Sequence, residues 1–444
     1  MIRKLLRRVF RRGRLAEHPV ETIAADRHGI RREQVSPGAR RVCETLQKEG
    51  FRAYVVGGAV RDLIAGIEPK DFDVATDATP DQVRSLFRRS RIIGRRFQIV
   101  HVMQGAETLE VSTFRAAHDE DTLKDEHGRV LRDNVWGSMG ADAARRDFTI
   151  NALYYDPVRE EVLDYHRGVE DLQKKTLRMI GDPRLRYRED PVRMLRAVRL
   201  AAKLGLRLDP KVEAPIAEMA TLIDNVPVAR LFDEMLKLLF SGYAVECVKR
   251  LRQEGLHHGL LPLLDVILEQ PLGEKFVMLS LTSTDERVRA GKAVSPGFLF
   301  ATLLWHEALA NWESRKKAGE LSMPALHVAM DTVLDQQAEK LAITRRIIGD
   351  IKEIWALQPR FEKRSGRAPL RLLEQPRFRA AWDFLVLRAA SGEIDAELSE
   401  WWREFQDAGD DRRNEMLLPD AGKKRRRSRS RGRNTPGTPA AESA

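Results

Sequence analysis

The stretch KDFDVATDATP, residues 70–80, places two aspartates one residue apart around a phenylalanine. Alternate side chains of a strand share a face, so Asp71 and Asp73 would point together while Phe72 and Val74 enter a core. Two carboxylates held this close repel each other unless a cation lies between them. The spacing predicts a strand that presents an oxygen-only site for Mg²⁺. A surface strand with solvated acids is the competing interpretation, and the motif by itself favours it.

The segments that flank this strand predict an alternation of helices and strands. Residues 36–50 have the periodicity of an amphipathic helix, 51–56 indicate a buried strand, and 59–66 indicate a short helix. Thr79 is a good N-cap, with Pro80 at the first helical position.

Beyond this helix the strand signal continues and then stops. Alternation over 91–115 predicts two strands joined by a turn at Gln104–Gly105, 142–156 is predicted to be helical, and 158–166 a short hairpin. From residue 171 to about 407 only helical periodicity remains. The expected fold is an α/β head with a small mixed sheet, followed by an all-helical neck and body.

A double glycine precedes the acidic pair by 13 residues, in VVGGAVRD, residues 55–62. A buried strand there leads through Gly57 and Gly58 directly into a helix, whose first N–H groups and dipole favour phosphate oxygens. The missing Cβ atoms let a triphosphate approach the backbone. Arg61 can add a charged contact to the phosphates, and Asp62 can hold that arginine or approach the metal. A tight turn without a ligand is the alternative, but a phosphate turn beside a metal pair is much more specific than either motif alone.

Two further segments supply candidates for the same site. Glu110 lies on the strand predicted after the turn and is one candidate for a third catalytic acid. Asp147 competes with it, and the sequence does not separate the two. Asp147 and Asn151, four residues apart, would share a helical face, with Arg146 beside them as a nucleotide contact. Ordinary surface charges in a helical turn are the alternative.

The segment REDPVRMLRAVR, residues 188–199, places Asp190, Arg193 and Arg196 on a predicted helix. Asp190 and Arg193 are i, i+3 neighbours and could form a pair whose hydrogen-bonding edges select a nucleobase. A solvated helix face with an incidental ion pair is the alternative, and for this segment alone it is slightly favoured.

With these elements in this order, residues 50–240 resemble the class II nucleotidyltransferases, the family of bacterial poly(A) polymerases and CCA-adding enzymes. The resemblance implies a head, neck and body, two catalytic metal ions, and addition of nucleotides to RNA 3′ ends without a template. The family's metal pair maps onto Asp71 and Asp73, which implies Mg²⁺ as cofactor and a nucleoside triphosphate as substrate. Its nucleotide-pocket helix maps onto Asp190 and Arg193.

Within the family the segment IIGRRFQIVHV, residues 92–102, favours polyadenylation. CCA-adding enzymes carry a glycine–threonine-type strand here, whereas Arg95, Arg96 and Phe97 look like the poly(A) polymerase variant. ATP is therefore the expected substrate, and Arg95 and Arg96 are expected RNA contacts. CCA addition to tRNA is the alternative within the family.

The net charge of +11 is concentrated at the two ends of the chain. Residues 1–14 and 421–444 carry about +7 each, which leaves the segment between them slightly acidic. The C-terminal residues are expected to be disordered and to contact RNA phosphates without sequence selection; the basic side chains are Lys423, Lys424, Arg425, Arg426 and Arg427.

Composition excludes other classes of protein. No run of 18 apolar residues is present, so no membrane span or membrane partner is expected. Cys43 and Cys247 are the only cysteines, which argues against a disulfide framework and favours the cytoplasm. The Arg-rich first residues also resemble an organellar address, although a plain basic tail is the favoured interpretation.

The expected function is polyadenylation of RNA 3′ ends, and hence a role in mRNA processing and turnover. A non-catalytic RNA-binding protein would leave the phosphate turn and the acidic pair unexplained. A phosphohydrolase would need a His-Asp metal pair, and the histidines of the helical half have no adjacent aspartate. The expected domains are a basic extension, the catalytic head, the neck with nucleobase pocket and RNA-binding region, the body and the tail, in the order 1–35, 36–170, 171–240, 241–420 and 421–444.

Overall fold

The computed structural model describes residues 20–94, 98–116, 136–256, 271–338 and 342–419. The chain forms two compact units with a boundary between Ile348 and Gly349, and each unit is described by itself. The predicted boundaries of head, neck, body and tail stay a prediction.

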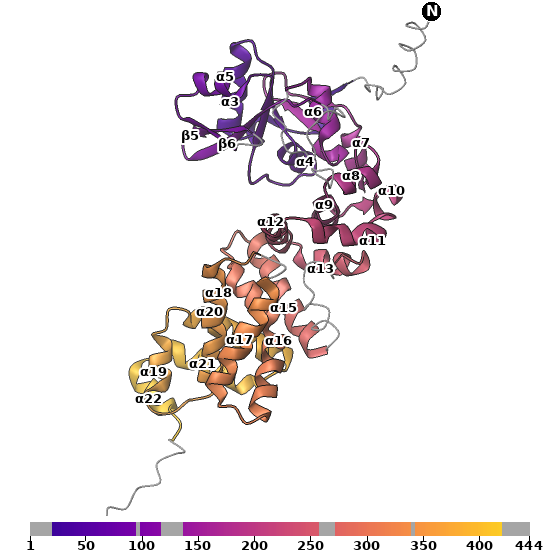
Figure 1. The fold of residues 1–444 in the computed structure, drawn as a ribbon. Helices are drawn as coiled ribbons and strands as arrows, with labels where there is room; N and C mark the ends of the chain where they lie inside the picture. The colour runs from indigo at the N-terminus through magenta and orange to yellow at the C-terminus, as the bar shows by residue number, and fades with distance from the viewer. Residues whose placement is uncertain (1–19, 95–97, 117–135, 257–270, 339–341, 420–444) are drawn as a thin grey trace, which may run out of the picture. The chain divides into compact units, whose positions relative to one another are not determined.

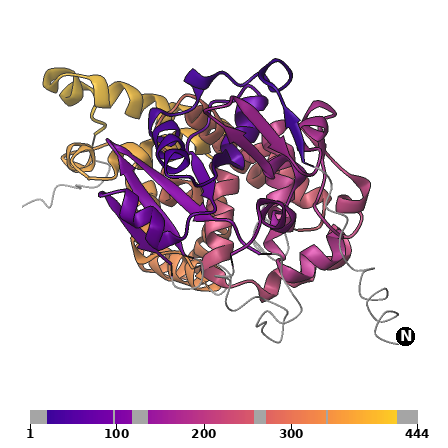
Figure 2. The same cartoon turned by 90° about the horizontal axis from the view of Figure 1, so that it is seen from above.

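The first unit begins with an eight-stranded mixed sheet (Figures 1 and 2) in the order β1-β8-β7-β2-β3-β6-β5-β4. Neighbouring strands are antiparallel except β3 and β6, which run parallel. The strands are β1 Glu21–Ile23, β2 Ala53–Val56, β3 Asp73–Thr76, β4 Ser90–Ile93, β5 Ile99–Gln104, β6 Glu107–Thr113, β7 Leu153–Asp156 and β8 Glu161–Asp164.

Both faces of this sheet are covered, and the strand order places β2 and β3 at its centre. All four residues of β2 are buried, as expected for a strand between two apolar layers. One layer contains the buried residues of α3 (Pro37–Lys48), α4 (Gly58–Ile64) and α5 (Pro80–Leu86). The other layer contains residues of α6 (Met139–Arg145). The predicted helix starts are confirmed at Ser36 and Thr79, whose side chains accept hydrogen bonds from the amides of Ala39 and Gln82.

Three predictions for the head were wrong in detail. The segment 158–166 is not a hairpin by itself, because it holds one strand, β8, which pairs with β7 and β1. The segment 91–115 forms three strands rather than two, because β4 pairs with β5 before the turn at Gly105 leads into β6. The segment 142–156 is not one helix: α6 ends at Arg145, a 3₁₀ turn covers Thr149–Asn151, and β7 follows. The apolar residues of LYYD lie between β2 and β8, so sheet pairing overrode helical periodicity.

Helices dominate the first unit after β8, as predicted, with one exception. Two short strands, β9 Thr176–Leu177 and β10 Arg207–Leu208, pair in parallel. The helices are α7 Gly168–Gln173, α8 Pro183–Glu189, α9 Val192–Leu204, α10 Pro210–Glu213, α11 Ile216–Met219, α12 Val228–Leu239, α13 Ala244–Gln253, α15 Pro271–Arg289, α16 Pro296–Lys317 and α17 Ser322–Ala338. Shorter elements are α2 Ala25–His28, the 3₁₀ turns Arg32–Gln34 and Ala220–Asn225, and the start of α18 Arg345–Leu357.

The second unit is helical, with its own aromatic core. Trp402 is fully buried and donates its indole N–H to the carbonyl of Phe361 over 2.9 Å. After α18 the unit contains the 3₁₀ turn Gln358–Arg360 and the helices α19 Ala368–Leu373, α20 Phe378–Ser391, α21 Ala396–Asp407 and α22 Asp410–Met416. The head sheet and the helical remainder confirm the predicted fold class.

Candidate active site

The acidic pair lies at the start of β3, as the alternation predicts. Asp71 and Asp73 are exposed, whereas Phe72 and Val74 are buried. Asp73 is in register with Glu110 on the parallel strand β6, so the two carboxylates leave the sheet on the same face. Sequence spacing proposed Glu110 as a neighbour of the pair, and the strand register puts it there.

The pKa of Asp73 reflects the neighbouring carboxylates. Part of the residue is exposed to solvent, but its carboxylate is partly desolvated by the surrounding protein. Partial desolvation and the charge of Glu110, with a smaller contribution from Asp71 and opposed by Arg146, raise the pKa of Asp73 to about 6. A carboxylate destabilised by two neighbouring carboxylates fits a cation site, because a bound divalent ion would remove that repulsion. Among the residues that the structure describes, however, no three ligating side chains are already arranged around a common point.

The double glycine forms the predicted turn beside these acids. Val56 is the register partner of Asp73, so Gly57 follows directly on the strand next to the acidic pair. The Gly57 amide donates to the carbonyl of Leu153 over 3.1 Å, which holds the turn against β7. Gly57 has φ 73° and ψ −123°, a conformation that side chains disfavour. Gly58 is the first residue of α4 and has no such requirement.

We expect Gly57→Ala to lower the free energy of unfolding by about 1–3 kcal/mol, because alanine is strained at this φ. A Cβ there would also lie 3.3 Å from Nη1 of Arg146. Urea unfolding measures the effect. Gly58→Ala is the matched control, since its Cβ would only reach ordinary contact, 3.6 Å from Nη2 of Arg61. Equal destabilisation by the two substitutions would contradict the assignment of the strain to Gly57.

Arg61 and Asp62 lie beneath the turn and are buried, 7% and 6% exposed. Arg61 donates from Nε to Asp62 over 2.8 Å and from Nη1 to the side-chain oxygen of Asn151 over 2.6 Å. Of the two possibilities left open for Asp62, holding the arginine is the one seen. The Arg61 guanidinium is thus occupied by protein groups. Arg146 also forms an ion pair, with Asp142 at 3.1 Å, but its Nη1 lies next to Gly57.

Asp147 and Asn151 come together, although the predicted helix is wrong here. Asp147 lies in the loop after α6, and the Asn151 amide donates to it over 2.9 Å. Arg196 of α9 forms an ion pair with the same carboxylate at 2.7 Å. Burial opposes ionisation of Asp147, but Arg196 and the hydrogen bonds lower its pKa to about 2. Asp147 is therefore a stable anion with a protein counter-ion.

Asp190 and Arg193, the residues predicted to select a nucleobase, line the same pocket but do not pair with each other through their side chains. Asp190 is not on a helix, because Pro191 separates α8 from α9. The Asp190 carboxylate pairs with Arg230 of α12 at 2.6 Å, while Arg193 pairs with Glu189 at 3.0 Å. A pocket of about 390 Å³ contains Asp190, Arg193 and Arg230 together with Arg146, Asp147 and Arg196. Oδ1 of Asp190 is buried with no hydrogen-bond partner in the described part of the chain.

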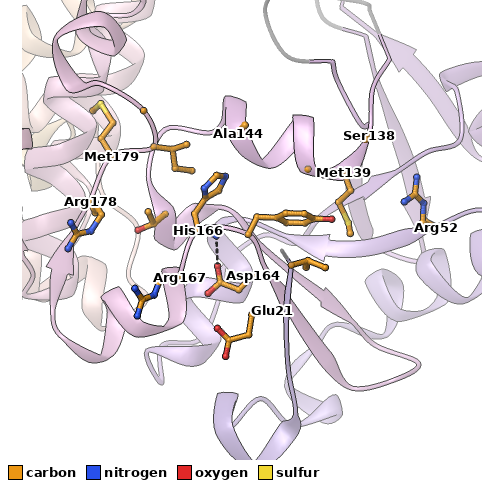
Figure 3. Close-up of a pocket in the computed structure, with 16 residues that line it drawn as sticks. Glu21, Arg52, Ser138, Met139, Ala144, Asp164, His166, Arg167, Arg178 and Met179 are labelled. Carbon is orange, nitrogen blue, oxygen red and sulfur yellow. Dashed lines mark hydrogen bonds between the residues drawn. The ribbon is translucent and has the colours of Figure 1, made fainter. Parts of the chain in front are cut away.

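A larger cavity of about 1040 Å³ is lined in part by α6 and contains none of the predicted residues. Arg167 and Arg178 lie at one end and Arg52 at the other (Figure 3). Each of these arginines is paired with a carboxylate, of Glu170, Asp171 and Asp77 respectively. The smaller pocket differs in containing predicted nucleotide-site residues and the buried, unpartnered Oδ1 of Asp190.

Comparison with known proteins decides the family. The chain is 44% identical to the poly(A) polymerase I of Haemophilus influenzae over 406 residues, 89% of this chain and 90% of that protein. The chain belongs to the poly(A) polymerase family. The poly(A) polymerase I of Escherichia coli O6:H1 is 43% identical over 431 residues, 94% of this chain and 92% of that protein. The predicted enzyme class, a polynucleotide adenylyltransferase that adds AMP to RNA without a template, is confirmed.

Three family models locate parts of the enzyme along the chain. The poly A polymerase head domain matches residues 53–178, the probable RNA and SrmB-binding site of polymerase A matches 205–268, and the polymerase A arginine-rich C-terminus matches 318–435. The RNA-binding match agrees with the prediction of RNA as partner.

CCA-adding enzymes are more distant relatives. The CCA-adding enzyme of Bacillus subtilis is 34% identical over 297 residues, 67% of this chain and 72% of that protein. The crystal structure of the Bacillus stearothermophilus CCA-adding enzyme in complex with CTP aligns with a TM-score of 0.58 and 26% identity, covering 83% of this chain and 82% of that one. Polyadenylation, rather than CCA addition, is thus the supported choice.

Some predicted residues lie outside the described part of the chain: Arg95, Arg96, Lys423, Lys424, Arg425, Arg426 and Arg427. Sequence reasoning missed others, chiefly Arg230 and Lys203, which approach the site from α12 and α9. Their only signal was a basic residue on an amphipathic helix, which does not indicate a partner. Within the described ranges, no helix is both long and apolar enough to cross a membrane.

Proposed function

We propose that the enzyme transfers AMP from ATP to RNA 3′ ends beside the central strands β2, β3 and β6 of the head sheet. One observation carries the proposal: the register of Val56 with Asp73, and of Asp73 with Glu110, brings the glycine turn that follows Val56 next to these two carboxylates, with Asp71 two residues before Asp73. The first N–H groups of α4 have no partner within the helix and favour the triphosphate. Arg146, at the Gly57 turn, supplies positive charge to it.

Asp71 and Asp73 are the proposed ligands of Mg²⁺, two ions being expected. Bound there, Mg²⁺ would supply Lewis-acid chemistry, lowering the pKa of the RNA 3′-hydroxyl and neutralising the departing pyrophosphate. The protein's part is to align the hydroxyl and the α-phosphorus and to stabilise charge. Glu110 is the proposed third acid, because it faces Asp73 whereas Asp147 is neutralised by Arg196.

Adenine selection is proposed for the pocket of Asp190, Arg193 and Arg196, with Arg61, Asp62 and Asn151 supporting the nucleotide site from below. The free oxygen of Asp190 can accept from an exocyclic amine, and Arg230 orients that carboxylate through its other oxygen. Adenine and cytosine share an amine next to a ring acceptor, so pocket size has to separate them.

Contacts to RNA phosphates are proposed for Arg95, Arg96 and the basic C-terminal residues. Such contacts hold RNA of any sequence. A cytoplasmic location is also proposed, and the two thiols support it, since Cys43 and Cys247 are both free and buried.

Primer extension tests the proposal, using the full chain, Mg²⁺, an unstructured RNA with a free 3′-OH, and each NTP alone. We expect a ladder of many added residues with ATP and little incorporation with CTP, GTP or UTP. Extension that stops after one to three residues, requires CTP and favours tRNA-like ends would replace polyadenylation by CCA addition. Absence of incorporation with every NTP would leave only RNA binding.

The raised pKa of Asp73 predicts how metal binding depends on pH. A proton competes with the metal below a pKa of about 6, so the affinity of the metal-free enzyme for Mn²⁺ should rise with pH, by about tenfold per unit below pH 6, and level off above it. Calorimetric titration between pH 5 and pH 8 measures this. Asp190→Asn should keep the same profile, and a flat profile between pH 5 and pH 7 would contradict the role of Asp73.

A further inference from the structure

Three basic residues of α9 lie at positions 196, 199 and 203, on one face of the helix by their i, i+3, i+7 spacing. Each pairs with an acid from a different element. Arg196 pairs with Asp147 at 2.7 Å, and Arg199 with Glu234 of α12 at 2.8 Å. Lys203 pairs with Asp62 of α4 at 2.7 Å. Lys203 thus reaches the helix that follows the glycine turn, 141 residues earlier in the chain.

The ion pairs of Arg196 and Lys203 connect α9 to the two ends of one chain of side-chain hydrogen bonds, and together they form a closed ring. Asp62 binds Arg61, Arg61 binds Asn151, and Asn151 binds Asp147, each through a side-chain hydrogen bond of 2.9 Å or less. The α9 helix closes the ring, because Arg196 and Lys203 are about 10 Å apart along its axis. The ring joins the base pocket, which Asp147 and Arg196 line, to the turn that would bind phosphate.

Within this ring, Lys203 holds one of the two oxygens of Asp62. One oxygen of Asp62 accepts from Arg61 and the other from Lys203. The Asp62 side chain is only 8% exposed, so water cannot replace a lost donor at low cost. Without Lys203, that oxygen of Asp62 would lose its donor and the side chain would have to rotate to find another, so that Arg61 would lose its support beneath Gly58. The positive charge of Arg61 depends on Asp62, because burial and the nearby Arg199 lower the pKa of Arg61 whereas Asp62 raises it.

We propose that Lys203 is a positioning residue for the triphosphate half of the nucleotide site. It acts through Asp62 and Arg61 on the Gly57–Gly58 turn and touches no substrate atom itself. The proposal rests on the proposed function, because it assumes that this turn binds phosphate. A purely structural role, in which Lys203 only attaches α9 to the head, is the alternative.

The test is calorimetric binding of ATP, inorganic tripolyphosphate and adenosine to the full chain and to Lys203→Met. We expect the variant to bind ATP and tripolyphosphate about 10–100-fold more weakly and adenosine within about twofold of wild type. In primer extension the KM for ATP should rise by the same factor, with kcat within about threefold. Lys203→Arg, which keeps the cation, should restore most of the loss. Lys317→Met, which removes an exposed lysine at the end of α16, controls for net charge and should change none of these values.

Unchanged tripolyphosphate binding in Lys203→Met, or equal weakening of tripolyphosphate and adenosine, would overturn the positioning role. Should Lys203→Met fail to fold, Lys203→Gln, which still offers one hydrogen-bond donor, takes its place with the same criteria. A wild-type chain that adds no AMP would refute the proposed function instead. The tripolyphosphate comparison needs no turnover, so the two failures are distinguishable.

Discussion

Asp73→Asn should lower the rate of AMP addition by a factor of at least about 10³, equivalent to about 4 kcal/mol of transition-state stabilisation. Asparagine keeps the shape of the side chain but removes the negative charge that would hold the metal beside Asp71. Asp73 is in register with Glu110 on β6, so the strand pairing fixes which side chain of β3 faces Glu110. Single-turnover primer extension at saturating ATP and Mg²⁺ measures the loss.

The fold of this variant should survive. Partial desolvation and Glu110 raise the pKa of Asp73 to about 6, so above that pH the metal-free protein carries an Asp73 charge that costs more in the folded state than in the unfolded chain. Removing the charge relieves this cost, and we expect the Tm of metal-free Asp73→Asn at pH 7.5 to equal or exceed that of wild type. Asp81→Asn, on the exposed first turn of α5, is the control for loss of one carboxylate. Activity within tenfold of wild type in Asp73→Asn would refute the proposed metal site.

Separate substitution of Glu110 and Asp147 should distinguish the two candidates for the third acid. Glu110→Gln should slow AMP addition by about 10²-fold and weaken Mn²⁺ binding, with little change in Tm, because its side chain is 56% exposed. Asp147→Asn should instead lower the free energy of unfolding by about 2 kcal/mol, since it leaves Arg196 without its counter-ion. Mn²⁺ affinity should be unchanged in Asp147→Asn.

Calorimetry with Mn²⁺ and urea unfolding, done on both variants, measure these differences. Arg196→Met serves as the matched control for Asp147→Asn, because it breaks the same ion pair from the other side. The reverse result, with loss of Mn²⁺ binding in Asp147→Asn and none in Glu110→Gln, would transfer the role of third acid to Asp147. Either outcome settles a choice that the spacing of residues along the chain left open.

The local motifs of the head were accessible from the sequence because their cause is local. Alternation around Asp71 and Asp73 depends only on the period of a strand, and the helix start at Thr79 depends on one cap and one proline. The glycine turn follows from a backbone conformation that only glycine adopts readily, which the φ of Gly57 bears out. Family membership followed from the same motifs in their order.

The contacts that complete the site were decided by tertiary structure. The register that places Glu110 beside Asp73 is set by pairing of β3 with β6, and the helical interpretation of 142–156 failed because β7 is enclosed between β2 and β8. Asp190 pairs with Arg230 and Asp62 with Lys203, over 40 and 141 residues of chain. A charged side chain encodes that it needs a partner, but its choice of partner depends on which helices the fold brings together. For this reason the acidic pair and the glycine turn could be predicted from local sequence, whereas the contacts that hold the proposed nucleotide site depend on the packing of α9 and α12.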